Sequence, residues 1–342
     1  MMIRWVDLGM TMTGFGRLGL VLLLAGLTHG LSAVRAPGAE EAGKPAGPIP
    51  VIVATDIGDD IDDTWALGLL LKCPELDVKL VVGDYGKAEY RAKLIAKMLE
   101  VAGRTDVAVG VGLPIDPKGD GPQADWVKDY ELDRYPGKVH RDGVQAMIDL
   151  IMASDRPITV IAIGPLPNVA EALRREPRIA QRARFVGMHG SVRRGYGGGD
   201  KPSAEWNVRA AVKACQTVFT ADWDMTITPL DTCGVVDLFG EQYATVRDAN
   251  DPIAAAIIEN YRMWSKDKRR AEERSSTLYD TVAVYLAIRH DWCKMESLGI
   301  RVTDDGMTVI DEKAKRVDVA TDWKDLPAFR AWLVERLTAG AK

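Results

Sequence analysis

The sequence predicts a single-domain α/β protein, built on an open and mostly parallel sheet with helices on both faces. From residue 49 onward, short apolar runs rich in β-branched residues alternate with segments of helical period, which is typical of parallel sheets. Neither a Pro/Gly/Ser-rich linker nor an internal repeat interrupts this region. The chain has 342 residues, 47% hydrophobic and 27% charged, which is enough to bury one large core.

The expected elements follow this alternation in order. Residues 49–55, IPVIVAT, are a β-branched run typical of a buried strand, and residues 64–72, TWALGLLLK, carry the apolar face of a helix. The predicted strands are 49–55, 76–83, 107–111, 158–163, 184–188 and 225–229, and the predicted helices are 64–72, 89–102, 143–153, 169–175, 208–219, 251–270 and 281–289. This order indicates a doubly wound, Rossmann-like sheet, whose ligands bind at the carboxyl ends of the strands.

The N-terminal segment has the pattern of an export signal. Arg4 and Arg17 precede the apolar run 18–27, LGLVLLLAGL, which has the length of a signal-peptide core and is too short for a stable membrane anchor. We expect a signal peptide over 1–36, a flexible linker over 37–48 and a catalytic domain over 49–342. The protein is then periplasmic or secreted; the alternative is a misplaced start ahead of a cytosolic enzyme.

Charge and cysteine content narrow the range of protein classes further. The chain has 44 basic and 49 acidic residues, a net charge of −5, and lacks a Lys/Arg block, so nucleic acid is not an expected partner. The four cysteines, which are too few for a disulfide scaffold, either pair after export or remain buried thiols; they are Cys73, Cys215, Cys233 and Cys293.

An acidic cluster follows the first predicted strand. Five carboxylates lie within eight residues, and they are Asp56, Asp59, Asp60, Asp62 and Asp63. One aspartate would suffice to cap the next helix, and a hard divalent cation accounts for the others, because adjacent carboxylates repel each other unless a cation compensates them. Oxygen ligands favour Ca²⁺ or Mg²⁺, although Gly58 excludes an EF-hand spacing. The alternative is a solvated acidic loop.

Several motifs in order along the chain resemble those of the nucleoside hydrolase family, of the inosine–uridine-preferring type. They are 55–67 (TDIGDDIDDTWAL), 102–107 (AGRTDV), 140–143 (HRDG), 162–168 (AIGPLPN), 188–190 (MHG), 204–207 (AEWN), 228–231 (TPLD) and 278–284 (LYDTVAV). Ala54 replaces an aspartate that the family often has, and two extra residues precede the Asp62-Asp63 pair. The chain therefore resembles a divergent, exported branch of the family.

The resemblance implies Ca²⁺-dependent hydrolysis of the N-glycosidic bond of a ribonucleoside, giving ribose and free base; Mg²⁺ is the second choice of ion. It implies a cation held by Asp56, Asp63, Asp280 and the carbonyl of Ile163. Asp56 would take the proton of the attacking water. Asp62 would bind a ribose hydroxyl, or would merely cap the first helix.

The resemblance also implies contacts to the sugar and the base. Glu205, Trp206 and Asn207 resemble the segment that clamps the ribose, with a helix N-cap as the alternative. Asp84 stands where the family usually has asparagine, and there it would contact the sugar and alter substrate choice.

Three residues are candidates for the acid that protonates the leaving base. Tyr279 stands where some family members have histidine; His140 and His189 are the others, although a lone histidine is more often structural. Trp126 and Tyr130 either stack on the base or simply pack in their loop.

Three hypotheses remain open. The first is a nucleoside hydrolase, the second a hydrolase of another ribosyl or glycosyl compound with the same cation site, and the third a sugar- or nucleoside-binding protein without activity. The acidic cluster favours the first two, because capture of a sugar does not require convergent aspartates. The resemblance implies a small-molecule nucleoside or ribosyl partner and a homo-oligomer, a dimer or tetramer.

Overall fold

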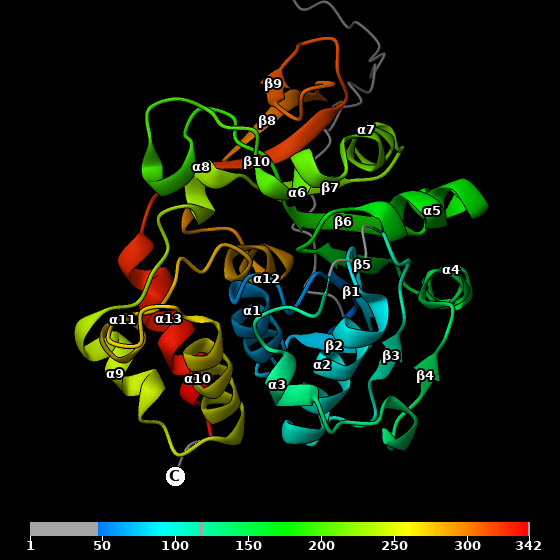
Figure 1. The fold of residues 1–342 in the computed structure, drawn as a ribbon. Helices are drawn as coiled ribbons and strands as arrows, with labels where there is room; N and C mark the ends of the chain where they lie inside the picture. The colour runs from blue at the N-terminus through cyan, green and yellow to red at the C-terminus, as the bar shows by residue number, and fades with distance from the viewer. Residues whose placement is uncertain (1–46, 116–118, 341–342) are drawn as a thin grey trace, which may run out of the picture. The chain divides into compact units, whose positions relative to one another are not determined.

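The computed structural model describes residues 47–115 and 119–340, and their centre is a ten-stranded sheet (Figure 1). The strand order is β4-β3-β2-β1-β5-β6-β7-β10-β8-β9. The strands are β1 (Ile49–Thr55), β2 (Leu76–Gly83), β3 (Ala108–Gly110), β4 (Val139–His140), β5 (Ile158–Ala162), β6 (Ala183–Met188), β7 (Met225–Thr228), β8 (Cys293–Val302), β9 (Thr308–Ile310) and β10 (Arg316–Trp323). The pairs from β4 to β10 are parallel, whereas β8 runs antiparallel to both β10 and β9. The predicted mostly parallel sheet is confirmed.

Helices cover both faces of the sheet, as predicted. They are α1 (Asp62–Leu71), α2 (Ala88–Val101), α3 (Ala124–Val127), α4 (Gly143–Ala153), α5 (Pro167–Arg175), α6 (Trp206–Ala210), α7 (Val212–Thr220), α8 (Leu230–Cys233), α9 (Gly240–Arg247), α10 (Pro252–Trp264), α11 (Arg270–Glu273), α12 (Thr281–Ile288) and α13 (Leu326–Thr338). One buried cluster joins the sheet to α1, α2, α10, α12 and α13, and the other joins it to α4, α5 and α7 (Figure 1).

The alternation of side chains along β1 explains how one strand serves both cores. Val51 and Val53 belong to the first cluster, and Ile52 and Ala54 to the second, because successive residues of a strand point to opposite faces. Val53 pairs with Val81 of β2 on one side and with Ile161 of β5 on the other. The sheet therefore continues in opposite directions from β1 and β5, and such a switch point opens a crevice beyond their carboxyl ends.

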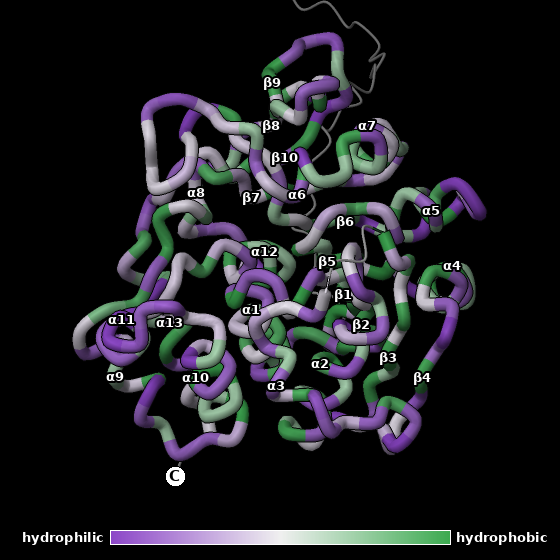
Figure 2. The backbone as a smooth tube through the Cα atoms, in the orientation of Figure 1, coloured by the Kyte–Doolittle hydropathy of each residue, from purple (hydrophilic) through white to green (hydrophobic). Residues whose placement is uncertain are grey.

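Two predicted helices differ from the expectation: one is divided and one is shorter. The helix predicted over 208–219 is broken at Ala211, whose backbone (φ −141°, ψ 53°) separates α6 from α7. The helix predicted over 251–270 begins after its N-cap Asp251 but ends at Trp264, since Ser265 is extended. The end of the predicted span reaches only the first residue of the short helix α11, which is hydrophilic (Figure 2).

The C-terminal strands β8, β9 and β10 were not predicted from the sequence, nor were α3, α8, α9, α13 and β4. In β8 only four of ten residues are buried, so the strand shows neither a continuous apolar run nor a strict alternation. The four cysteines are free and buried, which agrees with the buried-thiol alternative.

The predicted signal peptide, 1–36, lies outside the described residues, as does all of the predicted linker except residues 47 and 48. Among the helices that the structure describes, none combines the length and the hydropathy needed to cross a bilayer.

Candidate active site

A cavity of about 510 Å³ opens at the switch point of the sheet. Its walls come from the loops after β1, β5 and β6, from α6, and from the chain just before α12. The lining residues are Asp56, Asp59, Asp60, Asp62, Asp63, Ile163, Met188, Tyr196, Glu205, Trp206, Asn207, Trp264, Tyr279 and Asp280. The volume is in the range of sites for small molecules.

Three carboxylates from distant parts of the chain converge in this cavity. Asp62 and Asp63 begin α1 and Asp280 precedes α12, and one oxygen of each lies within 4.8 Å of the others. All three are buried. Burial, reinforced by the neighbouring carboxylates, raises the pKa of each well above its ordinary value. Buried carboxyl groups are costly to ionise without a counter-charge. A hard divalent cation bound to their oxygens would supply that charge and stabilise the ionised carboxylates.

Asp56 lies in the same cavity, against the turn after β5. A Cβ atom on Gly164 would lie only 2.6 Å from Asp56 Oδ1, so the turn approaches this carboxylate as closely as glycine allows. Burial raises the pKa of Asp56 to about 7, and the cation of Arg91 acts in the opposite direction. Asp56 is not part of the trio within 4.8 Å, but it lines the same cavity.

The loop between β1 and α1 is held by side chains of its own and by Arg91. Thr55 Oγ1 donates a hydrogen bond to Asp63 Oδ1 and accepts one from Ile57 N at 3.1 Å. Arg91, only 1% exposed, donates to the carbonyl oxygens of Asp56, Ile57 (2.8 Å) and Tyr85, and to Asp59 Oδ2 at 2.7 Å. These bonds fix the backbone that carries the acidic cluster.

Glu205 and Asn207 line the opposite wall. The carboxylate of Glu205 caps α6, accepting hydrogen bonds from the amides of Asn207 (2.7 Å) and Val208 (3.2 Å), and also from Gly190 N at 2.9 Å. Asn207 Nδ2 donates to the carbonyl of Ile163 at 3.2 Å. The helix-cap alternative therefore describes the carboxylate of Glu205 in this structure, and the residue also lines the cavity.

Four aromatic residues line the same cavity. Tyr196 and Trp206 are 46% and 41% exposed, and Tyr196 Oη accepts a hydrogen bond from Trp206 N at 2.8 Å. The rings of Tyr196 and Tyr279 meet edge to face with centroids 6.3 Å apart. Trp264 Nε1 donates to the carbonyl of Asp59 at 3.0 Å. These rings offer flat apolar surface beside the carboxylates.

The structure does not bring every predicted site residue to this cavity. His140 lies on β4, at the far edge of the sheet, and does not line the cavity. His189 is fully buried with Nε2 3.0 Å from the carbonyl oxygen of Gly164, and burial lowers its pKa to about 3, so the ring is neutral. A neutral, enclosed imidazole is unsuited to protonating a leaving base.

Asp84 also lies behind the cavity wall instead of on it. It is fully buried, Oδ1 accepts a hydrogen bond from Asn168 N at 3.3 Å, and burial raises its pKa. Trp126 is buried and donates to Glu259 at 3.0 Å, which agrees with packing of the loop.

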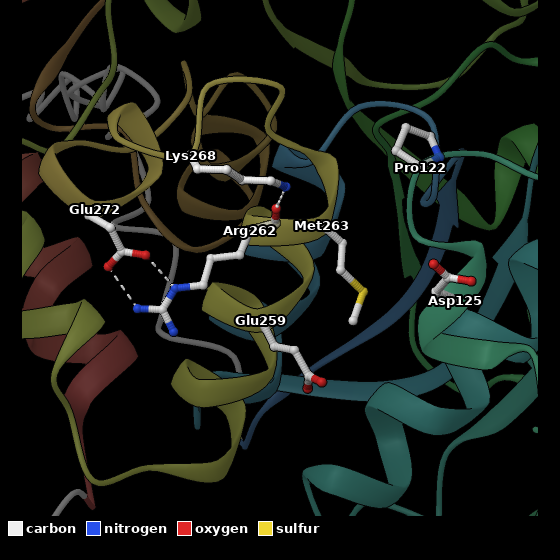
Figure 3. A pocket seen from close by; sticks show the side chains of 7 residues that line it. All are labelled: Pro122, Asp125, Glu259, Arg262, Met263, Lys268 and Glu272. Atoms are coloured by element: carbon white, nitrogen blue, oxygen red, sulfur yellow. Dashed lines mark hydrogen bonds and ion pairs between the residues drawn. The ribbon is translucent and has the colours of Figure 1, made fainter.

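A second cavity of about 540 Å³ lies between α3, α10 and α11 (Figure 3). It is lined by Pro122, Asp125, Glu259, Arg262, Met263, Lys268 and Glu272. Most of its charged groups have partners: Arg262 forms two hydrogen bonds with Glu272, Lys268 Nζ donates to the Arg262 carbonyl, and Glu259 accepts from Trp126. Its described residues do not form a convergent carboxylate trio like that of the acidic cavity.

Three residues that shape the site were not predicted from the sequence. Tyr196 and Trp264 lie in segments without a recognisable motif, and only their contacts identify them. Arg91 was hidden in a predicted amphipathic helix, where a charged residue is expected to face solvent. The sequence feature related to the inward position of Arg91 is the pair Gly83 and Gly86. A Cβ atom on either glycine would clash with the Arg91 side chain.

Comparisons with known proteins point to one family. The family described as inosine-uridine preferring nucleoside hydrolase matches residues 51–331. The non-specific ribonucleoside hydrolase RihC of Escherichia coli is 27% identical over 315 residues, which is 84% of this chain and 98% of that protein. The inosine-uridine preferring nucleoside hydrolase of Leishmania major is 28% identical over 294 residues, 78% of this chain and 90% of that protein.

A solved structure shares the fold. The purine-preferring ribonucleoside hydrolase from Gardnerella vaginalis superposes with a TM-score of 0.70 at 22% identity, covering 86% of this chain and 99% of that chain. The family match spans most of the chain and includes every residue that lines the acidic cavity. The chain therefore belongs to the inosine-uridine preferring nucleoside hydrolase family, a family of N-glycosyl hydrolases.

Proposed function

We propose that this protein hydrolyses the N-glycosidic bond of a ribonucleoside to ribose and free base, and that it depends on Ca²⁺. The observation that carries the proposal is the convergence of Asp62, Asp63 and Asp280 in the cavity that Asp56 also lines. The relatives named above are ribonucleoside hydrolases, which supports the same reaction. An all-oxygen donor set favours a hard cation, and Ca²⁺ tolerates irregular carboxylate geometry better than Mg²⁺ does.

The cation would be held by the predicted ligands Asp56, Asp63 and Asp280 with the carbonyl of Ile163. We add Asp62 as a further candidate ligand, because one of its oxygens lies within 4.8 Å of those of Asp63 and Asp280. When bound, the cation supplies a lowered pKa for water and a fixed positive charge beside the ribose.

Each of the side chains of the cavity then has its own role in the reaction. Asp56 accepts the proton of the attacking water at a carboxylate oxygen, for which a group in a buried, partly compensated position is suited. The transition state of glycoside cleavage has oxocarbenium character, and the surrounding carboxylates stabilise that positive charge. Glu205 and Asn207 on the opposite wall, with Trp206, orient the ribose.

Release of ribose from a panel of nucleosides, with Ca²⁺, with Mg²⁺ and after chelation, tests this function. We expect turnover that is lost on chelation and restored best by Ca²⁺. An equally active chelated enzyme would contradict the cation dependence. The absence of ribose from every nucleoside would instead favour the second hypothesis, another ribosyl or glycosyl substrate, or the third, a binding protein without activity.

Export and assembly complete the proposal. The apolar run 18–27 supports a periplasmic or secreted location, and the resemblance to the family supports a dimer or tetramer. Fractionation of cells that express the full chain tests the location. Light scattering of the purified protein tests the assembly, and a monomer at all concentrations would contradict it.

A further inference from the structure

The acidic cavity has more carboxyl groups than one divalent cation offsets. Seven of its lining residues bear carboxyl groups, namely Asp56, Asp59, Asp60, Asp62, Asp63, Glu205 and Asp280. Among the described residues that line it there is no lysine, arginine or histidine. A divalent cation compensates two charges, and Arg91 reaches the loop only from behind, where it pairs with Asp59. A cavity of one sign concentrates ligands of the opposite sign.

The aromatic rings of the cavity also favour a positively charged ligand, through a different interaction. Tyr196, Trp206, Trp264 and Tyr279 line it together with the carboxylates. Two of them are exposed, Tyr196 at 46% and Trp206 at 41%, and the guanidinium of Arg209 already lies over the Trp206 ring, 5.4 Å from its centroid. Aromatic faces attract cations through the ring quadrupole, and they also stack on flat rings. A flat, positively charged ring satisfies both the carboxylates and the aromatic faces.

The cavity also offers no histidine to protonate a departing base. His140 lies on the edge strand β4, and His189 is enclosed and held against Gly164. When the C1′–N bond of a neutral nucleoside breaks, the base receives the bonding electron pair and leaves as an anion unless an acid protonates it. A base with a fixed positive charge receives the same pair and leaves neutral. Such a substrate does not need an acid, whereas a neutral nucleoside would depend on Tyr279 or on a carboxyl group of the cavity.

From these three observations, and resting on the proposed N-ribosyl hydrolysis, we infer that the preferred substrate is an N-riboside whose base is a cationic heteroaromatic ring. N-alkylated pyridinium and N-alkylated purinium ribosides share this chemistry. In the reaction, the oxygen of water bonds to C1′, the C1′–N electrons neutralise the ring nitrogen, and the proton of water passes to a carboxylate and then to solvent. The products are ribose and a neutral base.

The insertion that distinguishes this loop supplies a suitable site for a test. Asp60 is exposed at the cavity and accepts a hydrogen bond from Ile61 N at 2.7 Å. The described residues include no cation within ion-pair distance of it. Asp60→Asn therefore removes one negative charge from the cavity. Asp304→Asn removes one from a solvent-exposed site paired with Lys213, and serves as the matched control.

The experiment compares matched ligands that differ in charge. The substrate pairs are nicotinamide riboside with its neutral 1,4-dihydro form, and 7-methylguanosine in its cationic form with guanosine. Because cationic ribosides are intrinsically more labile, 1-methylnicotinamide and nicotinamide are also compared as competitive inhibitors, a readout of binding alone. We expect at least roughly tenfold preference for the cation in each comparison, weakened by salt. Asp60→Asn should lower that preference roughly fivefold, and Asp304→Asn should leave it unchanged.

The failures are distinguishable. If the neutral nucleosides and nicotinamide are used or bound as well as the cations, the inference is overturned while N-ribosyl hydrolysis stands. If Asp60→Asn abolishes turnover of neutral nucleosides and spares the cationic ones, Asp60 is the acid for the leaving base and the inference is likewise overturned. If no compound in the panel releases ribose, the proposed function itself fails.

Discussion

One carboxylate oxygen of Asp63 and one of Asp280 lie within 4.8 Å of each other, although most of the chain separates the two residues. We expect Asp280→Asn to lower kcat/KM by at least ~100-fold and to weaken Ca²⁺ binding, because it removes one charged ligand from the trio. Ribose release and calorimetric titration with Ca²⁺ measure the two effects. The exposed Asp304→Asn should change neither, and full activity of Asp280→Asn would exclude this site.

Chelation should destabilise the folded protein, because it leaves buried carboxylates without a compensating charge. Saturation with Ca²⁺ at about a hundred times its Kd adds ~2.7 kcal/mol, which corresponds to a rise in Tm of about 4–8 °C. Thermal scans with EDTA and with Ca²⁺ measure the difference. Asp280→Asn should lose most of this rise in Tm. A Tm of the wild type that does not respond to EDTA would show that no cation binds tightly.

The stability of the cation-free protein should depend on pH in a definite direction. Burial raises the pKa of Asp56 and of Glu205 from 3.8 and 4.5 to about 7, so the folded state binds protons more tightly than the unfolded chain. The contribution of these groups is therefore present at acidic pH and is lost as the pH rises toward about 7.

Urea denaturation from about pH 5 to about pH 8 in EDTA measures this loss, which Glu205→Gln should reduce and Ca²⁺ should suppress. A stability that stays constant, or increases, over this range in EDTA would contradict the burial of ionisable carboxyls at the site.

Arg91 joins two loops of the site through hydrogen bonds to three backbone carbonyls and to Asp59. Arg91→Met should lower the free energy of unfolding by about 2–4 kcal/mol, because buried acceptors lose their donor. Arg91→Lys keeps the charge but not the several fixed donors, so its free energy of unfolding should lie between those of the wild type and Arg91→Met. Urea denaturation distinguishes them, and wild-type stability in Arg91→Met would show that water or rearrangement replaces the bonds.

His189 should act through structure and not as an acid. His189→Gln offers a side-chain amide to the carbonyl of Gly164, so kcat/KM should fall less than about tenfold and the shape of its pH profile should persist. His189→Phe leaves that carbonyl unpaired and should cost about 1–3 kcal/mol of stability. Loss of the acidic limb of the pH profile in His189→Gln would instead identify His189 as a catalytic acid.

The sequence by itself determined the alternation that builds the parallel sheet and the position of the acidic loop after β1. Both are local signals, since apolar runs and their period reflect which residues each element buries. It also indicated Asp280 as a partner of the loop, through motifs that resemble those of the family. Strand β8 was not predicted because its buried residues follow no regular period.

Only the tertiary structure decided which groups meet. It placed Asp62 with Asp63 and Asp280, enclosed His189, left His140 on an edge strand, and turned Arg91 inward behind the carboxylates. The physical reason is that proximity across loops, and the pKa shifts and hydrogen bonds that follow from it, depend on how elements pack, whereas the local sequence specifies the elements themselves.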